Sequence, residues 1–265
     1  MSVLTSEAVV LRTWPLRESD LIVSFFTRDY GRLKGVAKAA LKSRKRFGGA
    51  LEPMTMARAW FAERPRQELV RLDQLEIVRS PLSAPVDQVR LAVLSFFAEL
   101  IDEALPEHDP QETVFRLIVS VLEQTNPAQT SAAQSIANTE VSAEIGNPWM
   151  ALSYFSLWMT RLMGLLPDVF RCTACGEPLR PTEISFSSYS DGLFCAVHRG
   201  SNSNILSADS WQLAQRMLRA PVSAFAAEPW PRRRAQDLRR FAVQSLERHL
   251  ERKLRTAEAL NRLGG

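Results

Sequence analysis

The feature that most constrains the fold of this chain is the spacing of its three cysteines and one of its histidines. They stand as Cys172-x2-Cys175-x19-Cys195-x2-His198, and the chain contains no other cysteine. Two pairs of ligands, each separated by two residues, can close together on one tetrahedral zinc ion. Because three thiolates and an imidazole leave no coordination position for water or substrate, the pattern predicts one structural zinc per chain and not a hydrolytic site.

Length and composition indicate a soluble globular protein. The chain has 265 residues, of which 46% are hydrophobic, so about two domains are expected. Its longest apolar stretch, residues 149–166, contains Ser153, Ser156, Thr160 and Arg161 and is predicted to be a buried helix rather than a membrane span. The first ten residues lack the pattern of a signal peptide, and the odd number of cysteines disfavours a disulfide framework. We therefore expect a cytoplasmic protein.

The N-terminal part of the chain reads as strands. Runs rich in β-branched and aromatic residues occupy residues 7–14, 20–28, 32–37, 51–62 and 68–78, separated by turn residues. Five short strands without a long helix predict a small closed barrel, for which the five-stranded OB-fold is the leading candidate. An SH3-like barrel is the alternative.

A one-sided run of positive charge lies between the third and fourth predicted strands. From residue 32 to residue 46 there are seven basic side chains and no acidic one. These are Arg32, Lys34, Lys38, Lys42, Arg44, Lys45 and Arg46. Each cation that neutralises a nucleic-acid phosphate releases a condensed counterion, so such a run favours DNA binding. Aromatic residues on the neighbouring strands could stack on bases, although most are expected in the barrel core.

From residue 86 onward the apolar spacing becomes helical. Helices are predicted at residues 86–101, 114–122, 149–165 and 207–218, followed by one long helix at 232–263. The result is an α+β chain with a barrel at 1–80, a helical domain at 81–170 with a polar insertion near 125–146, a zinc-binding segment at 171–200 and C-terminal helices at 201–265. Residues 1–80 and 171–265 each carry 15 basic and 9 acidic residues, whereas 81–170 carries 3 and 11. Two basic ends therefore flank an acidic middle.

The sequence argues against an enzyme. It contains no Walker-type glycine loop, no Gly-x-Ser-x-Gly and no His-x-Glu upstream of the cysteines. Only His108 and His249 remain for acid–base chemistry. A metallo-nuclease would need an open metal position and clustered carboxylates, which the sequence does not supply.

Several stretches, in the same order along the chain, resemble the RecO family of bacterial recombination mediators. Residues 27–38, Thr-Arg-Asp-Tyr-Gly-Arg-Leu-Lys-Gly-Val-Ala-Lys, and 46–53, Arg-Phe-Gly-Gly-Ala-Leu-Glu-Pro, are similar to its N-terminal domain. Residues 161–168 running into Cys172-x2-Cys175-Gly176, then Phe186 and 191–195, are similar to its zinc module, and 247–254 to its last helix. The resemblance covers nearly the whole chain.

The resemblance implies a function. Such proteins have an N-terminal OB-fold that binds single- and double-stranded DNA, and they anneal complementary strands without ATP. Together with RecR they load RecA onto single strands coated with single-strand-binding protein, whose acidic C-terminal tail they contact. We therefore expect a nucleoid-associated DNA repair protein without a membrane partner, with the seven basic residues on DNA and the three cysteines and His198 on zinc.

Two departures from the family pattern are visible. His198 stands where a cysteine is the commoner fourth ligand, and the insertion near 125–146 is longer. The alternative function is a zinc-stabilised protein-interaction adaptor, without direct annealing activity, whose basic ends bind acidic protein segments.

Overall fold

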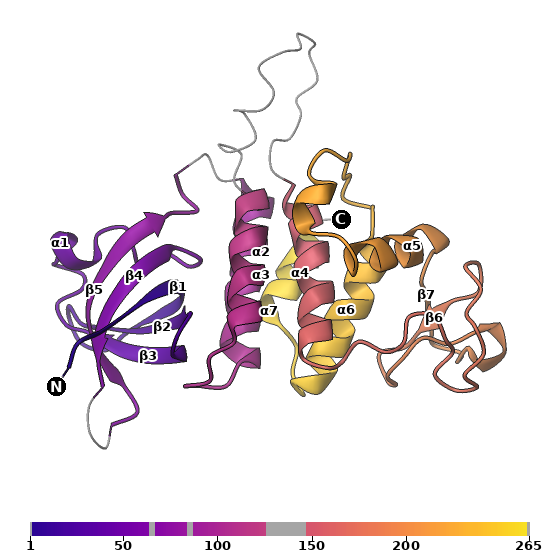
Figure 1. Ribbon diagram of the computed structural model, residues 1–265, viewed down its shortest axis with the longest axis horizontal. Helices are drawn as coiled ribbons and strands as arrows, with labels where there is room; N and C mark the ends of the chain where they lie inside the picture. The colour runs from indigo at the N-terminus through magenta and orange to yellow at the C-terminus, as the bar shows by residue number, and fades with distance from the viewer. Residues whose placement is uncertain (1, 64–66, 84–86, 126–146, 264–265) are drawn as a thin grey trace, which may run out of the picture. The chain divides into compact units, whose positions relative to one another are not determined.

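The computed structural model of the chain describes residues 2–63, 67–83, 87–125 and 147–263 (Figure 1). The predicted turn at residues 64–66 and all but the first residue of the polar insertion lie outside these described residues. The chain forms two compact units, Met1–Leu122 with Glu258–Leu263, and Glu123–Ala257. The first unit contains the strands predicted from the N-terminal sequence, and the second contains the cysteines.

Five strands close into a barrel in the first unit. They are β1 (Leu4–Pro15), β2 (Leu21–Thr27), β3 (Gly31–Ala37), β4 (Met56–Ala62) and β5 (Val70–Arg79). The strands pair in the order β1-β2-β3-β5-β4, β1 also bonds β4, and only the pair of β3 with β5 is parallel. This five-stranded closed topology confirms the predicted OB-fold over the SH3-like alternative.

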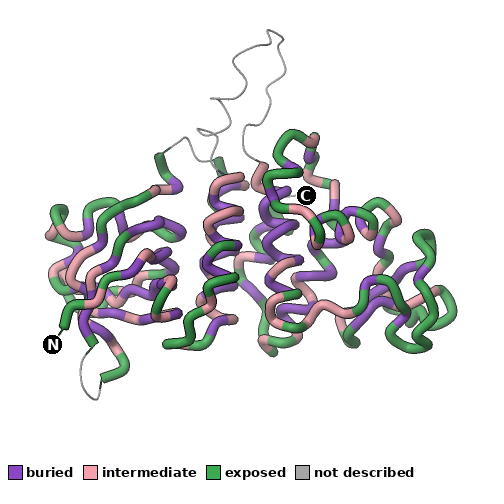
Figure 2. The backbone as a smooth tube through the Cα atoms, viewed as in Figure 1, coloured by how far each residue is buried: buried purple, intermediate pink, exposed green. Residues whose placement is uncertain are grey.

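Both faces of β2 are buried, and for different reasons. Val23 and Phe25 point into the barrel core, where Phe25 meets Phe61 edge to face at 5.8 Å between ring centroids. Ser24 and Phe26 point the opposite way and are equally buried. Figure 2 shows buried residues along the barrel strands and the helices of the chain. The strand is therefore apolar along most of its length, because another part of the protein covers its outward face as the barrel core covers its inward face.

Two helices of the first unit provide that cover. They are α2 (Gln88–Ala104) and α3 (Glu112–Thr125), which match the predicted helices to within a few residues. Ser24 donates a hydrogen bond to the Asp102 carboxylate at 2.6 Å, and the rings of Phe26 and Phe115 lie 5.9 Å apart. The helical pattern that starts near residue 86 thus belongs in part to the same compact unit as the barrel, which extends to Leu122.

The second unit is organised around α4 (Pro148–Leu162), which is buried on most faces. Asn147 caps its N-terminus by accepting a hydrogen bond from the Met150 amide at 3.1 Å. Trp158 donates its ring N–H to the carbonyl of Met217 at 3.0 Å, at the end of α5 (Ala208–Met217). Helix α6 (Gln236–His249) packs along α4, and the 3-10 turn η4 (Val222–Phe225) lies between α5 and α6 in the chain.

The predicted single helix at 232–263 is wrong. The structure has α6 followed by α7 (Arg255–Arg262), because Glu251 adopts a left-handed conformation at φ 52° and ends the first helix. Glu247, the last acidic residue of α6, then accepts hydrogen bonds from the Leu254 amide at 3.0 Å and from Lys253 at 2.7 Å. The apolar spacing continues through the break, which is why periodicity alone did not reveal it.

No helix in the described part of the chain combines the length and the apolar character that crossing a bilayer requires.

Candidate metal centre and basic loop

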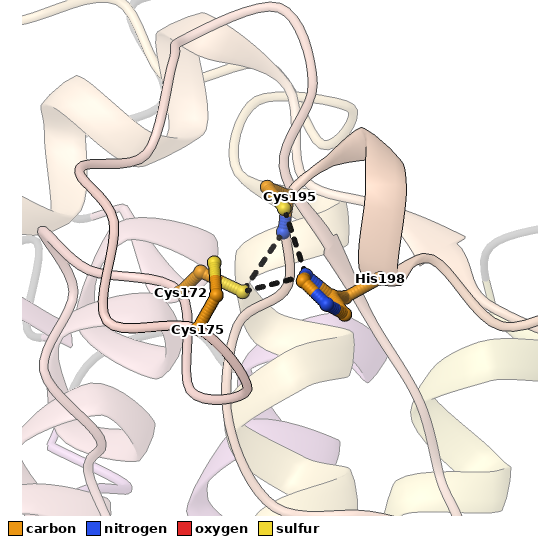
Figure 3. Close-up of side chains that lie close together, drawn as sticks. All are labelled: Cys172, Cys175, Cys195 and His198. Atoms are coloured by element: carbon orange, nitrogen blue, oxygen red, sulfur yellow. Dashed lines mark hydrogen bonds between the residues drawn. The ribbon is translucent and has the colours of Figure 1, made fainter.

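The four residues predicted as metal ligands come together in the second unit. The ligand atoms of Cys172, Cys175, Cys195 and His198 all lie within 4.8 Å of one another (Figure 3). The Nδ1 atom of His198 is 3.3 Å from the Cys195 sulfur and 3.9 Å from the Cys172 sulfur. Metal–ligand bonds of about 2.0–2.3 Å in a tetrahedron place ligand atoms roughly 3.3–3.8 Å apart. The cluster therefore has the size and the donor set of a single closed metal site.

Tight turns hold the two halves of this cluster. Gly176 donates to the Cys172 carbonyl at 2.8 Å and the His198 amide to the Cys195 carbonyl at 3.1 Å, so each ligand pair closes a turn. Gly192 sits where a Cβ would lie 2.0 Å from the Thr173 hydroxyl, and Thr173 bonds the backbone of Leu193. This close approach brings the second ligand pair against the first.

Backbone amides lower the pKa of two of the three thiols, Cys172 and Cys195. The pKa of Cys175 is raised instead: the backbone bond of Glu177 lowers it, but burial and the neighbouring cysteines outweigh that bond. Burial raises the pKa of Cys172, but hydrogen bonds from the amides of Cys195, Cys175 and Ala174 outweigh it and lower the pKa overall. The amide of His198 likewise lowers the pKa of Cys195. Thiolate is the form that binds a metal ion.

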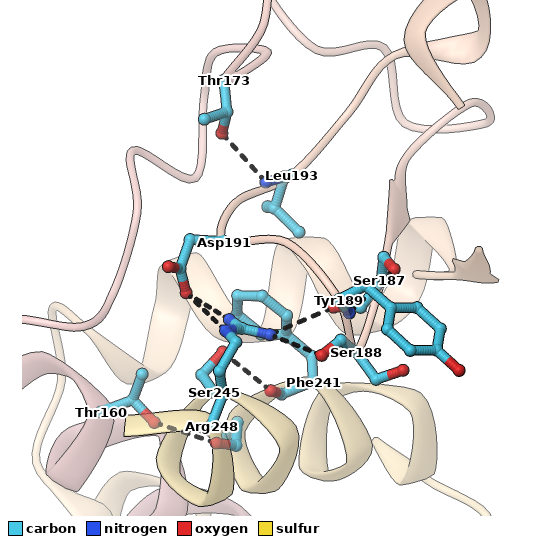
Figure 4. Close-up of polar contacts among 11 residues, drawn as sticks. Thr160, Thr173, Ser187, Ser188, Tyr189, Asp191, Leu193, Phe241, Ser245 and Arg248 are labelled. Atoms are coloured by element: carbon cyan, nitrogen blue, oxygen red, sulfur yellow. Dashed lines mark hydrogen bonds and ion pairs between the residues drawn. The ribbon is translucent and has the colours of Figure 1, made fainter. Parts of the chain in front are cut away.

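The segment around the cluster, residues 171–205, has little regular structure of its own, and we call it the metal segment. Its elements are β6 (Ser185–Phe186), the 3-10 turn η3 (Ala196–His198) and β7 (Asn204–Ile205). Helix α6 anchors it: the rings of Phe186 and Phe241 meet at 5.4 Å, and Arg248 donates to the Asp191 carboxylate and to the carbonyls of Ser187 and Ser188 (Figure 4). The segment that carries the four ligands is thus attached to α6 within the second unit.

The seven basic residues of the predicted DNA-binding run lie in three different environments. Arg32 is the most enclosed, with 11% of its side chain exposed. Its guanidinium donates to the Leu105 carbonyl at 2.8 Å and lies 3.2 Å from a Glu107 carboxylate oxygen and 3.5 Å from one of Asp102. Lys34 pairs with the same Glu107 at 2.8 Å. The charges of these two residues are therefore balanced within the first unit.

Sequence reasoning missed these acidic partners. Asp102 lies in the last turn of α2. Glu107 lies in the segment that follows, where its backbone forms an isolated β-bridge with Arg32 of β3. Hydrogen bonding by Lys34 lowers the pKa of Glu107, and the charges of Lys34 and Arg32 lower it further. Part of the acidic excess of residues 81–170 thus pairs with basic residues of β3. The partners are about 70 positions apart in the sequence, so no local sequence pattern reveals the pairing.

Four other members of the run are exposed. They are Lys38, Lys42, Arg44 and Lys45, in the connection between β3 and β4 that includes the short helix α1 (Arg44–Phe47). Among the described residues none of these four side chains forms an ion pair. We call residues 38–46 the basic loop. Arg46 is half-buried, and its guanidinium donates to the Lys38 carbonyl at 2.7 Å and to the Ser43 hydroxyl at 3.0 Å.

The aromatic residues beside the loop serve mainly as core. Phe25, Phe26, Phe47 and Phe61 are all fully buried. Tyr30 and Trp60 are half-buried, and Tyr30 packs edge to face on Phe61 at 5.3 Å.

Two of the C-terminal arginines bind other parts of the chain. Arg239 is buried and donates to the carbonyls of Arg232 and Arg234, and Arg248 donates to the Asp191 carboxylate in the metal segment. The exposed basic loop is therefore the clearest site for a polyanion in the first unit.

Comparison with known proteins covers the same two regions. Residues 1–81 match the family described as "Recombination protein O N terminal", and residues 85–144 and 140–258 match "Recombination protein O C terminal". A "DNA repair protein RecO" of Koribacter versatilis is 49% identical over 97% of this chain and 98% of its own length. Proteins of the same description from Anaeromyxobacter sp. (strain K) and Desulforamulus reducens are 30% and 27% identical, over 97% and 99% of this chain and 95% and 96% of their own lengths.

Proposed function

The chain belongs to the RecO family of DNA repair proteins, and from this premise we propose that it binds single- and double-stranded DNA through the basic loop and anneals complementary strands without ATP. The observation that carries the proposal is the set of four exposed cations on the barrel: Lys38, Lys42, Arg44 and Lys45. Arg32 and Lys34, whose charges are already balanced by Glu107 and Asp102, contribute less in this proposal than the sequence predicts.

The mechanism follows from the charge. Two DNA strands repel each other through their phosphates, and this repulsion opposes pairing. Cations on one protein surface neutralise phosphates of both strands and release condensed counterions, so the free energy of bringing the strands together falls. The step needs no catalytic group and no nucleotide hydrolysis.

We extend the proposal to partners on the strength of family membership. With RecR, the protein loads RecA onto single strands coated with single-strand-binding protein, whose acidic C-terminal tail it contacts. Association with the nucleoid in the cytoplasm follows from this role.

We also propose that the metal is a structural zinc, one per chain. Three thiolates and an imidazole are a preferred zinc ligand set, and all four ligand positions are filled by the chain. Zinc in such a site supplies folding free energy and no reactive water. Cys172, Cys175, Cys195 and His198 would hold it.

The DNA-binding proposal is tested by removing the four exposed charges. We expect the variant K38A/K42A/R44A/K45A to bind DNA more weakly and to lose about 0.9 of the salt slope for each duplex phosphate contact removed, because fewer counterions are released. The measurement is the dissociation constant for a fluorescent oligonucleotide over a range of salt concentrations.

The matched control removes four exposed arginines outside the loop. They are Arg58, Arg116, Arg180 and Arg233. This variant has the same net charge as the test variant, so it separates a local contact from a general electrostatic effect. Equal affinities and equal salt slopes in the two variants would contradict the assignment of DNA binding to the basic loop.

An annealing assay distinguishes the proposal from the adaptor alternative. Complementary strands coated with single-strand-binding protein are mixed with the protein in the absence of ATP. An annealing mediator accelerates duplex formation, whereas an adaptor leaves the rate unchanged and binds bare oligonucleotide only at low salt.

A further inference from the structure

The backbone of the basic loop is held by the turn that joins β1 to β2. The Ala39 amide donates to the Asp20 carboxylate at 2.7 Å, and the Leu41 amide donates to the Ser19 carbonyl at 3.2 Å. Ala39 adopts a left-handed conformation, with φ 53°. That conformation costs a non-glycine residue roughly 1–2 kcal/mol, so it persists only where surrounding bonds compensate for it. The Asp20 carboxylate makes the shortest of those bonds.

Arg46, the last residue of the basic loop, also holds its backbone. The Arg46 guanidinium bonds the Lys38 carbonyl and the Ser43 hydroxyl, and its carbon lies 5.1 Å from the centre of the Phe47 ring. Phe47 is itself 1% exposed in the barrel core. The Arg46 side chain therefore links the two ends of the loop, because its planar guanidinium donates to both acceptors at once.

Small apolar side chains complete the attachment. Ala40 and Ala50 are buried in the same core cluster as Phe47. Ala40 in the loop, and Phe47 and Ala50 just after it, are thus buried, while Lys38, Lys42, Arg44 and Lys45 remain exposed. The backbone that carries these four cations is consequently fixed before any ligand arrives.

We propose that Asp20 and Arg46 are positioning residues that preform the basic loop for DNA. The inference rests on the proposed function of that loop. A carboxylate beside a phosphate-binding surface repels DNA, so electrostatics alone disfavours Asp20 at this position. Its bond to the Ala39 amide supplies the reason for its presence: a preformed loop loses less conformational entropy on binding than a flexible one.

Substitutions at Asp20 give a test in which the two effects have opposite signs. Asp20→Ala removes a negative charge, which by itself tightens DNA binding, but it also removes the acceptor of the Ala39 amide. We expect affinity to fall about three- to tenfold, the size of one net hydrogen bond. Asp20→Asn keeps an acceptor oxygen and removes the charge, so it should bind at least as tightly as the unmodified chain. The salt slope should stay unchanged in both variants, because no phosphate contact is lost.

Glu18 provides the matched control. It lies exposed on the same turn, and among the described residues no bond joins it to the basic loop. Glu18→Ala removes the same charge as Asp20→Ala, so its affinity should equal or slightly exceed that of the unmodified chain. Arg46→Lys keeps the positive charge but cannot bond both acceptors in the same geometry; we expect weaker binding with an unchanged salt slope.

The outcomes are separable. Binding by D20A as tight as by E18A, or binding by D20N as weak as by D20A, overturns the role of Asp20. Unaltered affinity in R46K, or a salt slope that falls by about 0.9 as for a lost duplex phosphate contact, overturns the role of Arg46. Thermal unfolding of each variant reports folding, and if D20A does not fold, D20N and R46K decide. Full DNA affinity in K38A/K42A/R44A/K45A would instead refute the function proposed for the loop.

Discussion

Gly31 lies at the turn between β2 and β3, where two separate constraints apply. Its φ of 70° is left-handed, and a Cβ at this position would lie 2.4 Å from the backbone oxygen of Asp109. The second constraint arises because the segment after α2 crosses β3 at this point, with the His108 amide bonded to the Arg32 carbonyl at 3.0 Å. Gly31 therefore allows the chain to turn and also allows the acidic segment to reach Arg32.

Replacing Gly31 by alanine should destabilise the first unit by more than the cost of a left-handed alanine. That cost is about 1–2 kcal/mol, and the clash with Asp109 adds to it because backbone cannot move aside as a flexible side chain does. Urea unfolding of G31A gives the loss. Gly164→Ala is the control: its φ is 74° and, apart from its chain neighbours, no atom of the described residues lies within 4 Å of its would-be Cβ. Equal losses in the two variants would show that the approach of Asp109 carries no cost.

Glu107 links Arg32 and Lys34, and it gives the first unit a dependence on pH. Its pKa lies below the ordinary 4.5, chiefly through the hydrogen bond from Lys34. A carboxyl group whose pKa is lower in the folded state stabilises the fold above its unfolded pKa, and that stability is lost as the pH falls through the folded value. In Glu107→Gln, the free energy of unfolding should therefore decline less steeply below pH 4.5.

The measurement is urea unfolding at several pH values between neutrality and the acid limit of the fold. Glu52→Gln, a change at an exposed carboxylate in the same unit, is the control and should keep the original pH dependence. If E107Q also keeps it, the cluster of Arg32, Lys34 and Glu107 does not contribute to acid stability.

Among the elements, the metal segment depends most on a bound ion. Its strands β6 and β7 are two residues each, and little of it is regular structure. Its ligand pairs are separated by 19 residues of the chain, which a bound ion would tie together. Without the ion, the attachments of the segment to α6 still include the contact of Phe186 with Phe241 and the bonds from Arg248 to Asp191 and to the carbonyls of Ser187 and Ser188.

Metal removal should consequently loosen the segment around residues 172–198 first. Hydrogen exchange measured before and after chelation should show loss of protection there and in α6, because thiolates left without an ion repel one another. The barrel should keep its protection and the basic loop its DNA affinity. Chelation that abolishes DNA binding while the second unit stays protected would require the DNA site to be placed at the metal centre.

Across the whole molecule, the alternation of basic, acidic and basic regions has a partly internal explanation. Arg32 and Lys34 on the barrel pair with Asp102 and Glu107, and Arg28 lies 3.9 Å from Glu112, so part of the charge of the acidic region is balanced within the first unit. The positive charge of the basic loop stays exposed on the surface of that unit. The net charge of a region therefore does not identify which of its residues meet a partner.

The sequence by itself determined the elements whose causes are local. Runs of β-branched and aromatic residues predicted the five strands, helical spacing predicted α4, and ligand spacing predicted the metal cluster. The family was also recognisable, because its stretches occur in order along nearly the whole chain. The strands, helix α4 and each pair of metal ligands are set by residues a few positions apart.

Only the tertiary structure decided what the basic residues do. Whether a cation is exposed or paired depends on groups brought near it by folding: Arg32 meets Asp102 across 70 positions, and Asp20 meets the Ala39 amide across 19. The break at Glu251 depends likewise on its backbone conformation, which the apolar spacing does not report. Charge and hydrophobicity are properties of a residue, whereas burial and pairing are properties of its surroundings in the folded chain.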